Sequence, residues 1–75
     1  MKQYADTNGN SGVQGYKLGQ GLILVEFKDG SIYEYTSLSA GSQNIEHMGR
    51  LAAQGNGLNS FINSVVRQRY SRKIR

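Results

Sequence analysis

The chain has 75 residues, of which 37% are hydrophobic, and a formal net charge of +4. This length suits one small domain, near the lower limit at which a hydrophobic core supports itself. The absence of cysteine excludes disulfides and thiolate metal sites, and no apolar run approaches the roughly 18 residues of a membrane span. Because the N-terminus also lacks the apolar core of a signal peptide, we expect a cytoplasmic protein without membrane or metal partners.

The first residues predict a leader followed by a strand. Residues 1–11 are polar and rich in Asn, Gly and Ser, which is typical of a mobile leader. Residues 12–18 then place Tyr16 and Leu18 two positions apart, which is the spacing of one face of a short strand. The turn at residues 19–21 leads directly into a second strand, so these two strands are expected to be antiparallel neighbours.

The segment Ile23–Tyr35 predicts a hairpin, because two apolar runs of period two flank Asp29-Gly30. A two-residue turn would place Glu34 on the same face as the apolar side chains of the preceding strand. A three-residue loop over residues 28–30, with a bulged glycine, instead pairs Val25 with Tyr33. That register separates charged from apolar side chains, and we therefore favour it. Its apolar face holds Ile23, Val25, Phe27, Tyr33 and Tyr35.

Two helices are predicted after the hairpin. Residues 36–41 read as a loop, and Ser42 is the expected N-cap of a helix over residues 43–54. The segment Gly55-Asn56-Gly57 ends this helix, since glycine suits a left-handed C-terminal cap. A second helix is expected from Leu58, where apolar residues recur with helical spacing as far as Val65.

These elements predict an α+β fold, namely a three-stranded antiparallel meander followed by two short helices packed on one face. The expected organisation is a flexible leader over residues 1–11, one domain over residues 12–70 and a basic tail over residues 71–75. The charge is unevenly distributed, because the first 65 residues carry a net charge of −1 and the last ten carry +5. This asymmetry indicates an anionic partner at the C-terminus.

The strand and helix patterns resemble the KTSC domain, named for the C-terminal domain of some lysyl-tRNA synthetases. The similar residues are the Tyr33-Glu34-Tyr35 motif after Gly30, and the closing pattern from Phe61 through Asn63, Val66 and Arg67 to Tyr70. The resemblance covers residues 12–73. It implies the same α+β fold, a bacterial or phage setting, and a role in RNA binding suggested by the synthetase connection.

No constellation in the sequence predicts catalysis or a cofactor site. The only histidine, His47, falls beside the apolar stripe of the first helix, where a packed or solvated role is commoner than that of a base. The five carboxylates are scattered, and only Glu26 and Glu34 are expected to lie close together. We therefore expect a protein that is not an enzyme, with no catalytic, cofactor-binding or metal-binding residues.

The candidate functional residues are the basic and aromatic ones. Guanidinium groups interleaved with an aromatic ring suit phosphate contact and base stacking. The same cations could instead keep a small domain soluble and cap the last helix. The candidate nucleic-acid-binding residues are Arg67, Arg69, Tyr70, Arg72, Lys73 and Arg75, with Tyr33 and Tyr35 as further stacking residues. Because Tyr33 and Tyr35 share the predicted core face, both a packing and a stacking role stay open.

The expected partner is RNA or single-stranded nucleic acid. The alternative is a protein partner or a homodimer, for example a phage-type modulator of a host protein. In that case the outer face of the sheet, with Leu22, Leu24 and Ile32, would be the contact surface, because an exposed apolar strip requires a partner.

Overall fold

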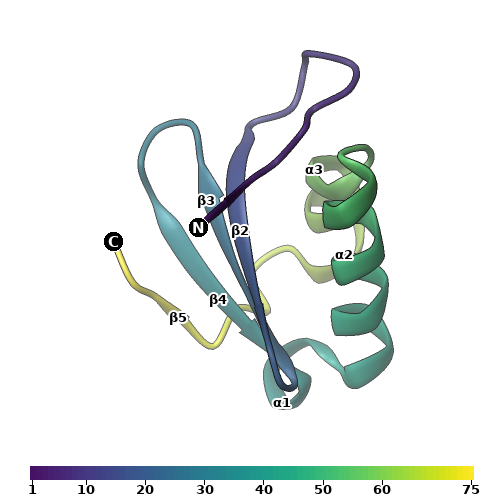
Figure 1. Ribbon diagram of the computed structural model, residues 1–75. Coiled ribbons are helices and arrows are strands. Elements are labelled where there is room, and N and C mark those ends of the chain that lie inside the picture. Colours follow the sequence, from purple (N-terminus) through teal and green to yellow (C-terminus); the bar gives the residue numbers. More distant parts are fainter.

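The computed structural model describes residues 1–75 and shows an α+β fold (Figure 1). An antiparallel sheet of five strands has the order β1-β2-β3-β4-β5. The elements in chain order are β1 (Lys2–Gln3), β2 (Val13–Gly19), β3 (Leu22–Phe27), β4 (Ile32–Thr36), α1 (Ser37–Ala40), α2 (Ser42–Gln54), α3 (Leu58–Phe61), the π-helical segment η1 (Ile62–Val66) and β5 (Arg72–Lys73). No helix has the length and apolar character needed to cross a membrane.

The predicted meander forms the centre of the sheet, and two short strands that were not predicted extend it at both edges. β1 pairs with β2 through Lys2 opposite Tyr16, and β5 pairs with β4 through Lys73 opposite Tyr33. Residues 1–11, expected to be a mobile leader, therefore contribute an edge strand. The segment 71–75, expected to be a tail, contributes the other edge. Strands of two residues have no measurable periodicity, so neither could be identified from the sequence pattern.

The hairpin between β3 and β4 has the predicted bulged register, with Val25 opposite Tyr33. The Phe27 N–H donates to the Ser31 carbonyl at 2.8 Å, and the Gly30 N–H donates to the Phe27 carbonyl at 2.9 Å. Gly30 has φ +92°, which explains why glycine stands there. The Asp29 carboxylate accepts from both the backbone N–H and the hydroxyl of Ser31, at 2.9 and 2.6 Å, and closes the loop.

The helical half differs from the prediction before the first predicted helix and in the second half of the second one. The expected loop contains the short helix α1, because Thr36 and Ser39 form a reciprocal capping box. The N-cap of α2 is Gly41, not Ser42, while Gly55 caps its C-terminus in the left-handed conformation as expected. The second predicted helix begins at Leu58 and continues as η1 until Val66.

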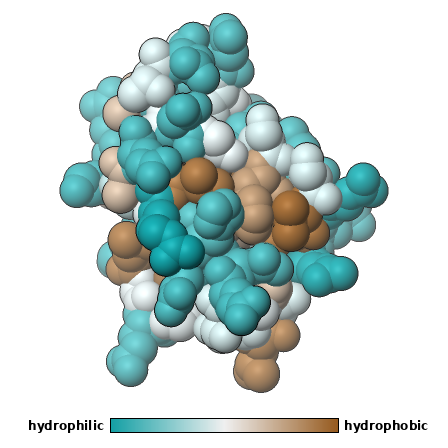
Figure 2. Space-filling model, turned by 90° about the vertical axis from the view of Figure 1, so that its right-hand side faces the viewer, coloured by the Kyte–Doolittle hydropathy of each residue, from teal (hydrophilic) through white to brown (hydrophobic).

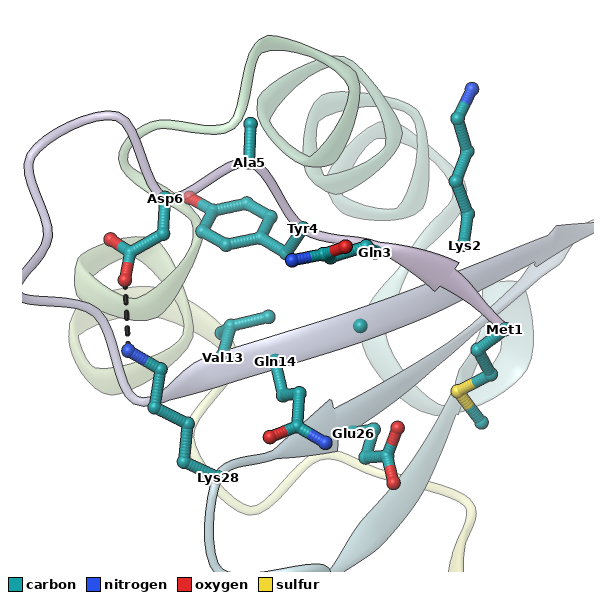
Figure 3. Close-up of a pocket in the computed structure, with 11 residues that line it drawn as sticks. Met1, Lys2, Gln3, Tyr4, Ala5, Asp6, Val13, Gln14, Glu26 and Lys28 are labelled. Carbon is teal, nitrogen blue, oxygen red and sulfur yellow. Dashed lines mark hydrogen bonds and ion pairs between the residues drawn. The ribbon is translucent and has the colours of Figure 1, made fainter.

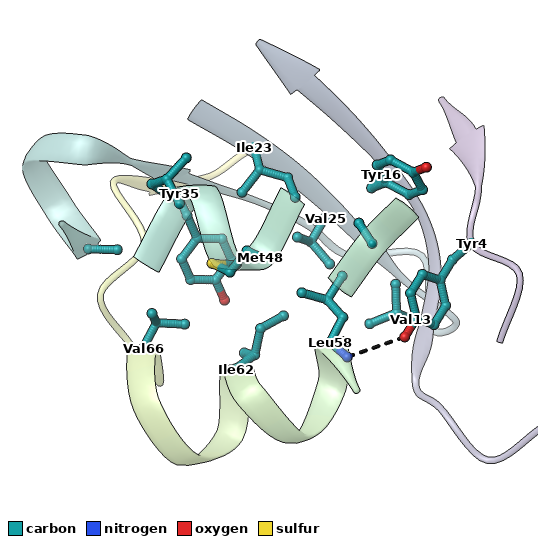
Figure 4. Packing of buried hydrophobic residues seen from close by; sticks show 13 residues of the cluster. Tyr4, Val13, Tyr16, Ile23, Val25, Tyr35, Met48, Leu58, Ile62 and Val66 are labelled. Carbon is teal, nitrogen blue, oxygen red and sulfur yellow. Dashed lines mark hydrogen bonds between the residues drawn. The ribbon is translucent and has the colours of Figure 1, made fainter. Parts of the chain in front are cut away.

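The helices cover one face of the sheet and leave the other face without a helical layer (Figure 1). The side that carries α2 and α3 exposes mainly hydrophilic residues with separate apolar spots (Figure 2). A core of 13 buried residues fills the space between the layers (Figure 4). Strand residues such as Ile23, Val25 and Tyr35 meet helix residues such as Met48 and Leu58 there.

Tyr4 also belongs to this core, although it lies in the predicted leader. Only 3% of its surface is exposed, and its hydroxyl accepts a hydrogen bond from the Leu58 N–H at 3.2 Å (Figure 4). The N-terminal segment is tied further to the turn between α2 and α3, because the Thr7 N–H donates to the Gly55 carbonyl at 2.8 Å. The folded unit therefore includes residues 1–11.

Candidate nucleic-acid interface

An aromatic cluster lies where the C-terminal segment returns to the sheet. The ring of Tyr70 packs edge-to-face on Tyr33, with 4.7 Å between the centroids, and also reaches Tyr35 at 6.2 Å. Phe27 extends the cluster on the other side of Tyr33 at 5.8 Å. The bulged register places these strand residues on one face, and Tyr70 folds against them after η1 ends.

The three predicted stacking residues are not equivalent. Tyr35 is only 2% exposed and packs in the core, whereas Tyr33 and Tyr70 are half-buried at its margin. Burial, together with the neighbouring Tyr33 and Tyr70, raises the pKa of Tyr35 to about 12. The open choice between packing and stacking is thus decided towards packing for Tyr35, while Tyr33 and Tyr70 each keep part of their surface accessible.

The turn after η1 sets the direction of the basic segment. Arg67 has φ +43°, one of two non-glycine residues with positive φ, and its N–H donates to the Ile62 carbonyl at 2.6 Å. The Arg69 N–H then donates to the Val66 carbonyl at 2.7 Å. This tight turn ends the helix before Arg69 and leads the chain back to the edge of β4. The side chains of Arg67 and Arg69 are exposed there.

The two cations of β5, Arg72 and Lys73, lie on opposite faces because side chains alternate along a strand. Arg72 lies opposite Glu34 and forms an ion pair with it at 3.1 Å, and Arg75 forms an ion pair with Glu26 at 3.3 Å. Lys73, on the opposite face, places its Nζ 5.8 Å from the centroid of the Tyr33 ring. Arg67 and Arg69 form no ion pair.

The structure thus separates the candidate basic residues into ion-paired and unpaired ones. Arg72 and Arg75 belong to the outer face, where their charges are compensated. Arg67, Arg69 and Lys73 lie without a carboxylate partner within ion-pair distance, on the part of the chain that surrounds the Tyr33–Tyr70 pair. The sequence could not reveal this division, since the acids involved lie 38 and 49 residues earlier in the chain.

Glu34 holds the C-terminal segment, residues 71–75, against the sheet. Its carboxylate accepts from the Ser71 hydroxyl at 2.7 Å and from the Arg72 Nε at 3.1 Å. Hydrogen bonding from Ser71, followed by Arg72, holds the pKa of Glu34 below its ordinary value. The carboxylate is therefore charged throughout the neutral range, and it holds β5 in place. The sequence predicts for Glu34 only a position near Glu26 and away from the apolar face, so this anchoring role was missed.

The outer face of the sheet offers less apolar surface than predicted. Ile32 is only 8% exposed, so it is not available to a partner. Ile74, the residue after β5, lies beside it, because the Ile74 N–H donates to the Ile32 carbonyl at 2.7 Å. Leu22 and Leu24 are half-buried on the same face.

The largest cavity lies beside the N-terminal segment and has a volume of about 600 Å³ (Figure 3). It lies between β1, the start of β2 and the end of β3, and an ion pair of 2.9 Å between Lys28 and Asp6 closes one end. Hydrogen bonding from Lys28 is the main cause of a lowered pKa at Asp6. The sequence does not predict this cavity, and the only signal for it is an aromatic residue, Tyr4, in a mostly polar segment.

The remaining candidate groups are placed as follows. The ring of His47 is half-buried and packs against Phe61, with 4.7 Å between the centroids. No group of three or more His, Cys, Asp or Glu side chains is arranged to hold a metal ion.

Comparison of the chain with protein-family models, curated proteins and solved structures finds no match.

Proposed function

We propose that this protein is a small non-enzymatic module that binds single-stranded nucleic acid, preferentially RNA. The observation that carries the proposal is the position of Arg67 and Arg69, which are exposed, form no ion pair and come within three residues before Tyr70. The half-buried ring of Tyr70 packs on Tyr33. Unpaired cations bind phosphates with release of counterions, and partly exposed aromatic rings stack on unpaired bases.

The ion pairs of the outer face limit the interface to fewer phosphate contacts than the composition suggests. Contact of Arg72 or Arg75 with a phosphate would break an ion pair with Glu34 or Glu26. Three cations therefore carry the proposed interface, namely Arg67, Arg69 and Lys73. For a single strand, three phosphate contacts correspond to a log–log salt slope of about −2, whereas all five cations would give a slope of roughly −3.5.

The proposal is tested by the fluorescence anisotropy of a short labelled single-stranded RNA, titrated at several salt concentrations. The double variant Arg67→Gln/Arg69→Gln removes two unpaired charges, so its slope should flatten by about 1.4 relative to the wild type. The matched control is Lys17→Gln/Arg50→Gln, which removes the same charge elsewhere on the surface. The absence of RNA binding at low salt, or equal weakening by both double variants, would contradict the proposal.

We further propose that the chain is a KTSC-like domain. The two motifs that carry the resemblance are distant in sequence but lie together in the fold, because Tyr70 packs on both Tyr33 and Tyr35. This contact supports the relationship, since it gives the motif residues one shared structural role. RNA binding, which the resemblance implies, would then use the exposed margin of the same aromatic cluster.

A protein-interaction module is the second candidate function. It is favoured by the uncovered outer face of the sheet, where Leu22 and Leu24 are partly accessible. Light scattering coupled to size-exclusion chromatography tests whether the chain forms a homodimer. In that case Leu24→Ser should lower the mass in solution, whereas Leu38→Ser, which changes a fully exposed leucine of α1, should not.

A further inference from the structure

Two Asn-Gly dipeptides meet on the surface of the molecule. Asn8-Gly9 lies in the N-terminal segment and Asn56-Gly57 in the turn between α2 and α3. The Asn8 Nδ2 donates to the Asn56 Oδ1 at 3.1 Å, and all four residues are exposed. Both asparagines line a crevice of about 260 Å³, in which Tyr4 is the one hydrophobic lining residue.

An Asn-Gly sequence can modify itself without an enzyme. The backbone nitrogen of the glycine attacks the side-chain carbonyl carbon of the asparagine, a reaction that a Cβ on the next residue would hinder. The attack requires a backbone N–H that is not held by an acceptor. Both dipeptides contain glycine and both are exposed, so the hydrogen bonding of the glycine nitrogen is the difference that bears on their reactivity.

The structure distinguishes the two glycine nitrogens. The Gly9 N–H donates to the Asp6 carbonyl at 2.9 Å, which withholds it from attack on Asn8. The Gly57 N–H has no acceptor among the backbone or side-chain hydrogen bonds of the chain. In addition, the hydrogen bond that Asn8 donates to the Asn56 Oδ1 withdraws electron density from the Asn56 Cγ, the carbon that is attacked.

We propose that Asn56 is a site of spontaneous deamidation and that Asn8 assists the reaction. The Gly57 nitrogen loses its proton and forms a bond to the Asn56 Cγ. The bond from Cγ to Nδ2 breaks, and ammonia leaves with that proton. Water then opens the cyclic imide on either side, which yields aspartate or isoaspartate at position 56. No oxidant, cofactor or metal is required.

The reaction would change the attachment of the N-terminal segment. Position 56 lies between Gly55, whose carbonyl accepts from the Thr7 N–H, and Leu58, whose N–H donates to the Tyr4 hydroxyl. Aspartate would add a carboxylate to the crevice that Asp6 also lines. Isoaspartate would lengthen the backbone of the connection between α2 and α3 by one carbon atom. The site thus lies where a slow chemical change would alter the contact between the N-terminal segment and the turn between α2 and α3.

The test uses the intact wild-type chain, incubated at mildly alkaline pH and analysed by peptide mapping with mass spectrometry. In the native protein Asn56 should deamidate faster than Asn8 by about 2- to 13-fold, the factor by which one hydrogen bond lowers the population of a free N–H. In concentrated urea the hydrogen bonds are lost, and the two sites should react at similar rates. The variant Asn56→Gln should remove the fast phase from the native protein.

Equal rates at the two sites in the native protein would overturn the proposal, as would faster reaction at Asn8. So would a ratio that stays unchanged in urea, because the preference would then come from local sequence and not from the fold. Persistence of the fast phase in Asn56→Gln would assign the reaction to another asparagine.

Discussion

Single hydrogen-bonding groups determine how the N-terminal segment and the returning C-terminal segment are held. The Tyr4 hydroxyl satisfies the backbone N–H of Leu58 in a buried position, and Glu34 accepts hydrogen bonds from both Ser71 and Arg72. The sequence suggested neither role, because each partner lies more than 35 residues away along the chain. Conservative substitutions of Tyr4 and Glu34 can therefore remove a hydrogen bond and leave the packing around it in place.

The hydroxyl of Tyr4 should contribute to stability beyond its ring. The change Tyr4→Phe keeps the ring but leaves the Leu58 N–H without its acceptor, so the free energy of unfolding should fall by ~1–3 kcal/mol. The matched control is Tyr16→Phe, since Tyr16 is also buried but its hydroxyl forms no hydrogen bond within the chain. Urea denaturation of both variants checks the prediction, and equal losses would contradict it.

Glu34 should make the stability depend on acid pH. Its folded-state pKa is lowered by Ser71 and Arg72, so its contribution is complete above the unfolded value of about 4.5 and is lost as the pH falls through the folded value. We therefore expect Glu34→Gln to lose less stability than the wild type when the pH decreases below about 4.5. Denaturation between neutral and strongly acidic pH measures the effect.

The control for this prediction is Glu46→Gln on the exposed surface of α2, which should keep the acid dependence of the wild type. If the free energy of unfolding falls with pH in the same way in Glu34→Gln and the wild type, the hydrogen bonds to the Glu34 carboxylate do not contribute to the acid dependence. In both variants the same formal charge is removed, so a difference between them reports the local hydrogen bonds.

Among the elements, the hairpin and the helix α2 follow local signals, whereas the edge strands do not. The bulged turn at Gly30 and the left-handed cap at Gly55 are both recognisable in the sequence, because glycine there meets a conformational need. What surrounds each glycine is decided by the fold. A Cβ at Gly30 would meet nothing within 4 Å, but one at Gly55 would lie 2.5 Å from the Ala5 Cβ.

This contrast predicts different effects for the same substitution at two turns. Gly30→Ala should lower the free energy of unfolding by about 1–2 kcal/mol, the conformational penalty of a positive φ. Gly55→Ala carries the same penalty and must also displace the N-terminal segment, so its loss should be larger. Thermal or urea denaturation compares them. If Gly30→Ala proved the more damaging change, the close approach of Ala5 to the cap would be disproved.

At the scale of the whole molecule, the two ends of the chain complete the sheet from opposite edges. β1 lies beside β2 and β5 lies beside β4, so the central meander has no long exposed edge (Figure 1). An unpaired edge presents free backbone groups that can pair with another chain. The ends of this chain therefore protect the sheet in addition to contributing Tyr4 and Tyr70 to its packing.

Removal of the N-terminal segment tests this role. Deletion of residues 1–6 removes β1 and the buried Tyr4, and should lower the free energy of unfolding by at least ~1.5–3 kcal/mol, the contribution of one large buried side chain. The matched truncation, of residues 1–3 alone, removes the strand but keeps Tyr4, so its loss should be smaller. An unchanged denaturation midpoint after deletion of residues 1–6 would instead support the mobile leader.

Local signals in the sequence account for the central meander, the register of its hairpin and the positions of α2 and the following helical segment. These features depend on turns, caps and periodicity, which act over a few residues. The helices were predicted less well at their ends: α1 was expected to be a loop, and the positive φ of Arg67 ends the last helix before Arg69.

Contacts between distant parts of the chain fix where its two ends lie and which candidate site residues stay accessible. It placed Tyr4 and Tyr35 in the core, left Tyr33 and Tyr70 at its margin, and paired Arg72 with Glu34. The physical reason is that a two-residue edge strand has almost no local preference of its own. Its backbone hydrogen bonds and ion pairs form with residues far away in the chain, and these partners exist only once the core has assembled.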